Sequence, residues 1–124
     1  MQKSQNSQKK IFVIDDDPDI IDFLHDFLEM QGYTPSVSTK ADYLETLQDG
    51  LLPDLIVLDV FLSGKDGREI VRYLKKQEKT RQIPVIMVSA HPSAEEAARA
   101  AGAEDFLAKP FELDELLLKI QRYL

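Results

Sequence analysis

The chain has 124 residues, and 15 basic against 22 acidic side chains give it a formal net charge of −7. A length near the usual ~100–150 residues predicts one domain, and an apolar content of 44% is too high for an intrinsically disordered chain. The absence of Cys excludes disulfides and thiol chemistry, no apolar run reaches the ~20 residues that span a bilayer, and the acidic charge disfavours nucleic-acid binding.

The first segment, residues 1–8, has no hydrophobic period and is expected to form a flexible N-terminal arm. No apolar stretch follows its lysines, so it does not resemble a secretory signal. Together with the absence of Cys, this predicts a cytoplasmic location. We expect the folded domain to span residues 9–124.

Five short apolar segments predict strands. Continuous apolar runs with β-branched residues are typical of strands that are buried on both faces of a parallel sheet. The predicted strands cover residues 11–14, 34–37, 55–58, 85–88 and 106–108.

Each predicted strand is followed by apolar residues at helical spacing, which predicts five amphipathic helices. Pro18 fits the first position of the first helix. The expected helix caps are Asp17, Thr39 with Asp42, Asp66, and Ser93 with Glu96, and the expected stops are Gly32 and Gly102.

This alternation of five strands with five helices indicates right-handed βαβ crossovers. The predicted fold is an α/β, doubly wound, flavodoxin-like (βα)5 domain with a five-stranded parallel sheet in the order 2-1-3-4-5. In that order the first and third strands are neighbours, and ligands bind beyond the carboxyl ends of the strands.

The residues at these carboxyl ends carry the candidate chemistry. They are Asp15, Asp16, Asp17, Asp59, Ser89 and Lys109. Two carboxylates a few ångströms apart repel by about 4 kcal/mol at an effective dielectric of 20, and a hard divalent cation relieves that repulsion. An all-oxygen ligand set favours Mg²⁺, with Mn²⁺ as the alternative. With a lysine and a hydroxyl alongside, the site suits phosphoryl transfer, with Asp59 as the nucleophile.

Four motifs occur in order along the chain: IDDDPDI, LIVLDVFLSGKDG, VIMVSA and AGAEDFLAKPF. Over residues 9–124 the sequence resembles the chemotaxis-regulator-like receiver domains of two-component response regulators. The resemblance implies a phosphorylation-dependent switch rather than an enzyme, with intrinsic self-phosphorylation and autodephosphorylation chemistry. The implied donor is a sensor histidine kinase or a His-phosphotransfer protein. The implied output is a partner protein or an attached effector domain, bound through the fourth helix, fifth strand and fifth helix, with no direct contact to nucleic acid or membrane.

The resemblance also implies a role for individual residues. Asp16 would bind Mg²⁺ directly and Asp15 through water, and Asp59 would be both phosphoacceptor and metal ligand. Phe61 would offer its backbone carbonyl to the metal. The other implied roles are Ser89 as the phosphoryl-binding hydroxyl, Lys109 as its cationic partner, Ser89 and Phe106 as switch residues, and Lys109–Pro110 as a cis peptide.

Three positions depart from the family pattern or are variable in it. Ser63 stands where proline is common, which implies a more mobile loop. Phe61 and His91 lie at positions that tune the lifetime of the phosphorylated state, in a direction that the sequence leaves open.

Two other functions fit parts of the sequence. Asp15-x-Asp17 superficially resembles the haloacid-dehalogenase-type phosphohydrolases, but the chain lacks a cap domain and Pro18 is ill placed. A binding module that has lost phosphorylation is the other alternative, and the complete set of site residues argues against it. Asp17 is expected to cap a helix, and His25 to lie on a solvated helix face.

Overall fold

The computed structural model describes residues 9–41, 44 and 52–124. Its elements are β1 (Lys10–Ile14), α2 (Pro18–Met30), β2 (Thr34–Ser38), β3 (Leu55–Asp59), β4 (Phe61–Leu62), β5 (Lys65–Asp66), α3 (Gly67–Lys76), β6 (Val85–Ser89), a 3₁₀ turn (Pro92–Ala94), α4 (Glu95–Ala101), β7 (Asp105–Ala108) and α5 (Leu113–Tyr123). The predicted arm, and most of the second predicted helix with its Asp42 cap, lie outside the described residues.

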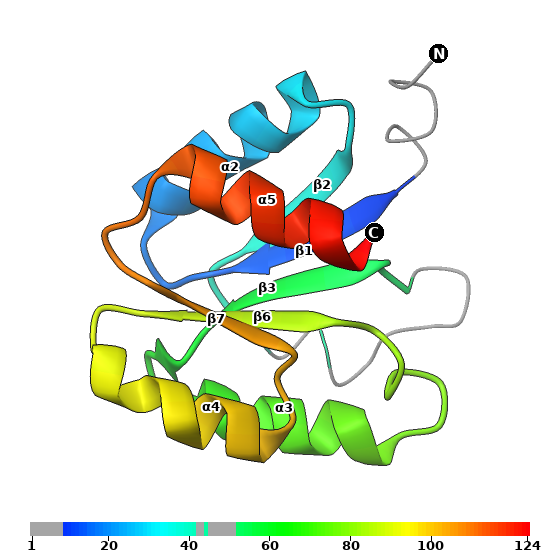
Figure 1. Cartoon of the computed structure of the whole chain (residues 1–124), viewed down its shortest axis with the longest axis vertical. Coiled ribbons are helices and arrows are strands. Elements are labelled where there is room, and N and C mark those ends of the chain that lie inside the picture. The colour runs from blue at the N-terminus through cyan, green and yellow to red at the C-terminus, as the bar shows by residue number, and fades with distance from the viewer. Residues whose placement is uncertain (1–8, 42–43, 45–51) are drawn as a thin grey trace.

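The five long strands form one parallel sheet in the order β2-β1-β3-β6-β7. Counted along the chain this is the predicted order 2-1-3-4-5, so the predicted topology is confirmed. Helices α2 and α5 cover one face of the sheet, and α3 and α4 cover the other (Figure 1). None of the helices in the described ranges is long and apolar enough to cross a bilayer.

The sheet separates two apolar cores. Ile11 and Val13 of β1 pack with the residues of α2 and α5, whereas Phe12 and Ile14 pack with those of α3 and α4. All four side chains are buried, because successive residues of a strand point to opposite faces and both faces are covered. This two-sided burial explains why the predicted strands read as continuous apolar runs.

The helix caps agree with the sequence at most positions. The Asp17 carboxylate accepts a hydrogen bond from Asp19 N at 3.0 Å, ahead of Pro18, and Asp66 accepts one from Arg68 N at 2.9 Å. Gly32 and Gly102 lie just after helices with φ of 94° and 117°, the left-handed region that glycine adopts without strain.

The predicted capping box of Ser93 and Glu96 is wrong. The N-cap of α4 is Ala94, without a side-chain hydrogen bond. The reason is Pro92, which begins a 3₁₀ turn, so that Ser93 lies inside the turn rather than ahead of the helix. A capping box does form at α5, between Glu112 and Glu115.

The loop after β3 is more ordered than the sequence indicated. Strands β4 and β5 pair as a short antiparallel hairpin, and α3 begins directly after it. Gly67 N donates to Val60 O at 2.6 Å, and a Cβ atom at this glycine would clash with the carbonyl oxygen of Asp59. Helix α3 therefore starts in contact with the backbone that follows Asp59.

Candidate functional site

Two buried carboxylates meet at the carboxyl edge of the sheet. Strands β1 and β3 pair in parallel with Ile14 opposite Leu58, so Asp15 and Asp59 follow at the same level. They are 3% and 6% exposed, and Asp16 beside them is exposed to solvent. One carboxylate oxygen from each of the three acids lies within 4.8 Å of the others. The predicted meeting of these acids is confirmed.

Lys109 supplies the positive charge between them. Its Nζ atom lies 2.6 Å from Asp15 Oδ2 and 3.2 Å from Asp59 Oδ2. Its amide donates to Ser89 O at 2.8 Å, and the peptide bond to Pro110 is cis, as predicted. The end of β7 thus brings the ammonium group into the acidic cluster.

Burial dominates the electrostatics of this cluster. Loss of solvent raises the pKa of the Asp59 carboxyl; repulsion from Asp15 acts in the same direction, and Lys109 only partly opposes them. Burial also disfavours the Lys109 ammonium, but its contacts with Asp15 and Asp59 outweigh that effect and raise the pKa of the lysine. Lys109 is therefore charged at neutral pH.

Three further carboxylate oxygens of the cluster accept local hydrogen bonds. Asp15 Oδ1 accepts from Asp17 N at 3.0 Å, and Asp59 Oδ1 accepts from Phe61 N at 3.2 Å. The Ser63 hydroxyl donates to Asp16 Oδ2 at 3.0 Å. The sequence analysis linked Ser63 only to loop mobility, and this bond ties the loop to an acid of the cluster.

Ser89 and Phe106 lie on the α3 and α4 side of the sheet. Ser89 is 1% exposed, and its Oγ accepts a hydrogen bond from His91 N at 3.0 Å. Phe106 is 6% exposed and belongs to the core cluster on that side, opposite Met87 in the β6–β7 register. The aromatic ring therefore points inward, into this core.

An aromatic contact spans the two loops beside the cluster. The rings of Phe61 and His91 meet edge to face, with centroids 5.5 Å apart at 83°. The guanidinium of Arg68 lies 5.6 Å from the Phe61 centroid, while its nitrogens bind Asp66. The sequence singles out Phe61 and His91 as two separate positions. It does not predict that their rings touch or that the Arg68 guanidinium lies over the Phe61 ring.

The acidic cluster fits a divalent metal ion. When ionised, three carboxylates against one ammonium leave a formal charge of −2, which a divalent cation balances. All its side-chain donors are oxygens, which suits Mg²⁺ and the similar Mn²⁺ rather than a softer metal. This agrees with the metal predicted from the sequence.

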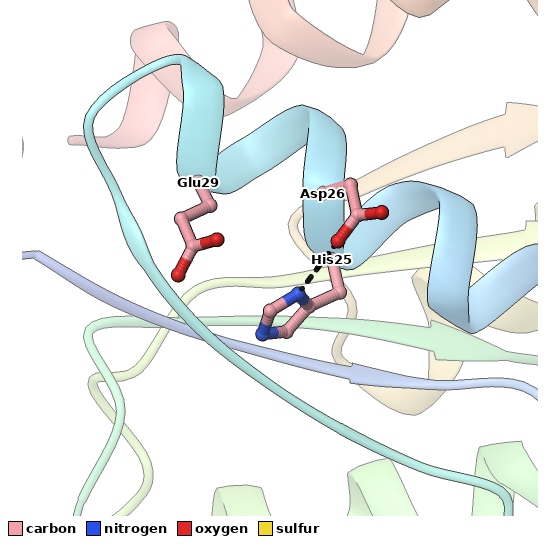
Figure 2. Close-up of side chains that lie close together, drawn as sticks. All are labelled: His25, Asp26 and Glu29. Carbon is pink, nitrogen blue, oxygen red and sulfur yellow. Dashed lines mark hydrogen bonds and ion pairs between the residues drawn. The ribbon is translucent and has the colours of Figure 1, made fainter.

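A second group of metal-capable side chains lies on α2, away from this cluster. His25, Asp26 and Glu29 each offer one ligand atom within 4.8 Å of the others, and His25 Nδ1 lies 3.3 Å from Asp26 Oδ1 (Figure 2). Asp26 and Glu29 are exposed, while the His25 side chain retains 35% of its exposure. The predicted solvated helix face is therefore confirmed, with the imidazole partly covered.

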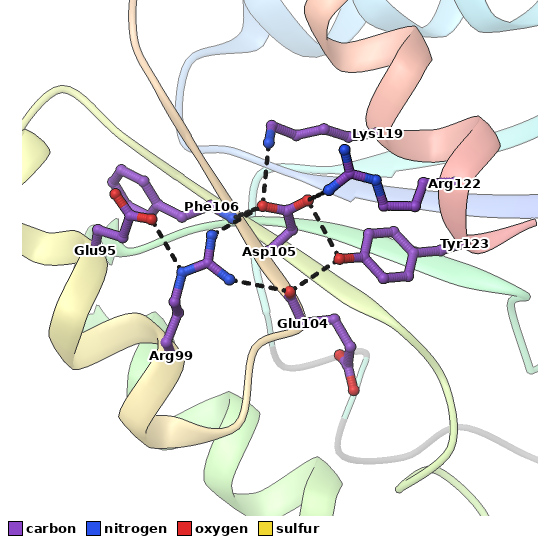
Figure 3. Close-up of polar contacts among 8 residues, drawn as sticks. All are labelled: Glu95, Arg99, Glu104, Asp105, Phe106, Lys119, Arg122 and Tyr123. Atoms are coloured by element: carbon purple, nitrogen blue, oxygen red, sulfur yellow. Dashed lines mark hydrogen bonds and ion pairs between the residues drawn. The ribbon is translucent and has the colours of Figure 1, made fainter.

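The sequence analysis missed one buried acid. Asp105, at the start of β7, has a side chain only 2% exposed. Its carboxylate accepts hydrogen bonds from Arg99 Nη2 and Lys119 Nζ, both at 3.1 Å, and from Tyr123 Oη at 3.3 Å (Figure 3). Arg122 adds an ion pair at 3.5 Å.

These contacts reverse the effect of burial on Asp105. Burial alone would raise the pKa of its carboxyl, but hydrogen bonds from Phe106 N, Lys119 and Tyr123, with the nearby positive charge, hold that pKa below its usual range. The available sequence signal was an acid directly ahead of an apolar strand. The partners come from two helices that the sequence does not place relative to it.

Comparison with known proteins gives one consistent family. The family model of the response regulator receiver domain matches residues 11–121. The chain is 36% identical over 117 residues to the DNA-binding dual master transcriptional regulator RpaA of Synechocystis, covering 93% of this chain and 48% of that protein. The chain spans about half the length, or less, of the curated relatives it matches.

Solved structures agree with the sequence matches. Chemotaxis protein CheY4 of Vibrio cholerae superposes with a TM-score of 0.84 at 27% identity, covering 94% of this chain and 98% of that one. Response regulator TrrA of Thermotoga maritima, solved in complex with Mg²⁺ and BeF, superposes with a TM-score of 0.83 at 26% identity, covering 94% and 100%. The predicted flavodoxin-like fold is therefore shared along nearly the whole chain.

Proposed function

Because the chain belongs to the response regulator receiver domain family of two-component signalling, we propose that Asp59 is the residue that accepts the phosphoryl group. The family acts as a phosphorylation-dependent switch rather than as a classical enzyme. The observation that carries the assignment to Asp59 is its position: it is a buried carboxylate at the end of a central strand, within reach of two further acids and of Lys109 Nζ.

We assign the metal ligands from the same arrangement. Asp16 and Asp59 would bind Mg²⁺ directly, Asp15 would bind it through water, and Phe61 would contribute its backbone carbonyl. When bound, the ion offsets the charge of the cluster and of the incoming phosphoryl oxygens. Asp16 is the exposed member, so it is the one that solvent and a metal ion reach first.

The transfer itself uses the Asp59 carboxylate as the nucleophile. One oxygen attacks the phosphorus of a phosphohistidine, the P–N bond breaks, and the imidazole nitrogen of the donor leaves with the bonding electrons and takes up a proton. Lys109 pairs with a phosphoryl oxygen. A small acyl phosphate serves as an alternative donor, and water later cleaves the aspartyl phosphate, restoring the carboxylate and releasing inorganic phosphate.

The new group changes the charge next to the switch residues. A phosphoryl group adds about −1.5 to −2 units of charge at neutral pH. Ser89 Oγ accepts from His91 N, so its O–H can donate to a phosphoryl oxygen. We propose that Phe106 exchanges between its inward position and an outward one, and that the face of α4, β7 and α5 binds the output partner or effector domain in one of the two states.

An apolar groove of this domain lies next to the acidic cluster, where a phosphodonor could dock. Between α2 and the segment after β7 lies a groove of about 530 Å³, lined mainly by Ile20, Phe23, Leu24, Ala90, Pro110 and Phe111. Lys109 also lines it, which places the groove beside the acidic cluster, and Phe23 is 59% exposed. We propose that a sensor histidine kinase or a His-phosphotransfer protein docks here.

The proposed setting is the cytoplasm. The relatives include DNA-binding regulators, but this chain matches only about half of such a protein. We therefore place nucleic-acid contact outside this domain, in a separate protein or an attached domain.

The test is Mg²⁺-dependent labelling with acetyl phosphate, followed by intact mass. We expect an adduct of one phosphoryl group in the wild type, none without Mg²⁺, and none in Asp59→Asn. Asp22→Asn, which alters an exposed acid of α2, serves as the matched control and should label normally. An adduct that persists in Asp59→Asn contradicts the assignment, and sustained turnover of p-nitrophenyl phosphate would favour a phosphohydrolase.

A further inference from the structure

We propose that His25, Asp26 and Glu29 form a second metal site, on the flank of α2, that takes a transition-metal ion such as Zn²⁺. It is separate from the acidic cluster at the carboxyl edge of the sheet and does not depend on phosphorylation. Figure 2 shows the three side chains beside the helix, with His25 in contact with Asp26, and one ligand atom of each lies within 4.8 Å of the others.

The backbone of α2 sets up this arrangement. His25 and Glu29 are four residues apart, so their side chains lie on one face of the helix about one turn apart. This i, i+4 spacing is the one by which helical ligand pairs bind Zn²⁺. Asp26 follows His25 and directs its carboxylate back to the same space, 3.3 Å from His25 Nδ1.

The distances suit one small ion. Tetrahedral ligands about 2.1 Å from Zn²⁺ are separated by roughly 3.4 Å, and ligands on opposite sides of an ion by about 4.2 Å. His25 Nδ1 and Asp26 Oδ1 form a hydrogen bond of 3.3 Å, and that separation is also close to the first value. The whole set lies within 4.8 Å, so small rotations of exposed side chains close it around an ion.

The charge of the helix gives a second, independent reason. The segment PDIIDFLHDFLEM contains four acids and no Lys or Arg, and its last turn has no basic residue. Asp26 and Glu29 lie near the helix C-terminus, where the helix dipole is already negative. Because α2 itself has no Lys or Arg, no basic side chain of this helix offsets the two carboxylates. A divalent cation would supply the missing positive charge.

The ligand types separate this site from the acidic cluster. An imidazole nitrogen with two carboxylates suits Zn²⁺ and related transition metals, whereas the oxygen-only cluster of Asp15, Asp16 and Asp59 suits Mg²⁺. The two sites therefore differ in the metal they select. A bound ion would join the last two turns of α2 and limit their fraying.

The experiment is a calorimetric titration of the whole chain with Zn²⁺ in the presence of excess Mg²⁺, with the His25 ring signals followed by NMR. We expect one binding event that shifts the His25 signals. His25→Ala and Glu29→Gln should each weaken it at least tenfold, about 1.4 kcal/mol. Two matched controls, Asp22→Asn on the same helix and His91→Ala at the other histidine, should bind as the wild type does.

The proposal is overturned by no Zn²⁺ binding once Mg²⁺ is in excess, by equal binding in His25→Ala, or by loss of binding in His91→Ala. Asp59→Asn keeps the outcome separate from the proposed function, because it should abolish labelling and leave Zn²⁺ binding unchanged. If it removes the Zn²⁺ event, the ion occupies the acidic cluster and the α2 site is disproved.

Discussion

Asp59 and Asp105 are both buried aspartates in one parallel sheet, yet they sit at opposite edges and in opposite environments. Asp59 ends β3, at the carboxyl edge, and shares a single lysine with Asp15. Asp105 begins β7, at the amino edge, and has three basic side chains and a tyrosine hydroxyl around it.

The difference appears in the pKa of the two carboxyl groups. At Asp59 burial prevails over the shared lysine and raises the pKa, whereas at Asp105 the partners prevail over burial and lower it. A carboxylate with too few partners is costly to the fold, and this agrees with the proposed binding of a metal ion and a phosphoryl group at Asp59. A carboxylate with a full set of partners holds β7, α4 and α5 together and has no capacity left for chemistry.

The substitution Asp59→Asn should have the largest effect and tests most directly whether Asp59 and Asp105 differ in role. We expect labelling by acetyl phosphate to be lost completely, while the free energy of unfolding without Mg²⁺ rises by about 1 kcal/mol, because a poorly compensated buried charge is removed. Mass spectrometry and urea denaturation measure the two effects. A variant that loses both labelling and stability would show that Asp59 is a structural acid like Asp105.

Mg²⁺ should act on one aspartate and not on the other. At a Mg²⁺ concentration about 100 times Kd, we expect the wild type to gain about 2.7 kcal/mol of stability. Most of this gain should be absent in Asp59→Asn and fully present in Asp105→Asn. Denaturation curves with and without Mg²⁺ provide the measurement, and an equal gain in all three proteins would mean that the ion binds elsewhere.

Asp105→Asn should lower the free energy of unfolding by about 2 kcal/mol, since it leaves clustered cations without their buried counter-charge. The cations are partly exposed and can recover some hydration, which limits the loss. Labelling at Asp59 should persist at temperatures where the variant is folded. The mutant Glu95→Gln, at the exposed end of the same network, is a matched control with a loss below about 0.5 kcal/mol.

The pH dependence of stability should separate the two acids more finely. The raised pKa of Asp59 means that ionisation costs the fold stability, so without Mg²⁺ this cost disappears as pH falls through the folded-state pKa. The lowered pKa of Asp105 gives a stabilising contribution above the unfolded value of about 3.9, and that contribution is lost as pH falls through the lower folded value. Urea midpoints between neutral and acid pH should show a flatter acid limb in Asp105→Asn than in the wild type.

The sequence predicted the parts of the site that topology alone determines. In a parallel sheet, residues that end adjacent strands meet, so Asp15 and Asp59 could be placed together from the apolar runs before them, with Lys109 expected at the same edge of the sheet but two strands away from Asp59. The surroundings of Asp105 depend instead on how α4 and α5 are turned against β7, and helix periodicity does not fix that rotation.

Local sequence patterns gave wrong predictions of helix caps where an adjacent residue changed the backbone conformation. The pattern of Ser93 and Glu96 fits a capping box, but Pro92 started the turn one residue too early for it. Glu112 caps α5 although glutamate is not among the preferred N-cap residues. The close approach of Gly67 to Asp59 depends on the path of the β4–β5 hairpin. Each strand of this hairpin has only two residues, which is too short for a recognisable sequence pattern.

That approach at Gly67 has a consequence for anyone engineering this switch. The chain leaves Asp59, makes its hairpin and returns to within contact of the Asp59 carbonyl, so its length is set by two fixed ends. Libraries that aim to change the lifetime of the phosphorylated state should therefore randomise the side chain at Phe61, one of the two positions expected to tune it, and keep the number of residues in the loop constant. An insertion or deletion here would displace Asp59, the proposed nucleophile, together with the loop, so that an effect on phosphorylation kinetics could not be separated from an effect on folding.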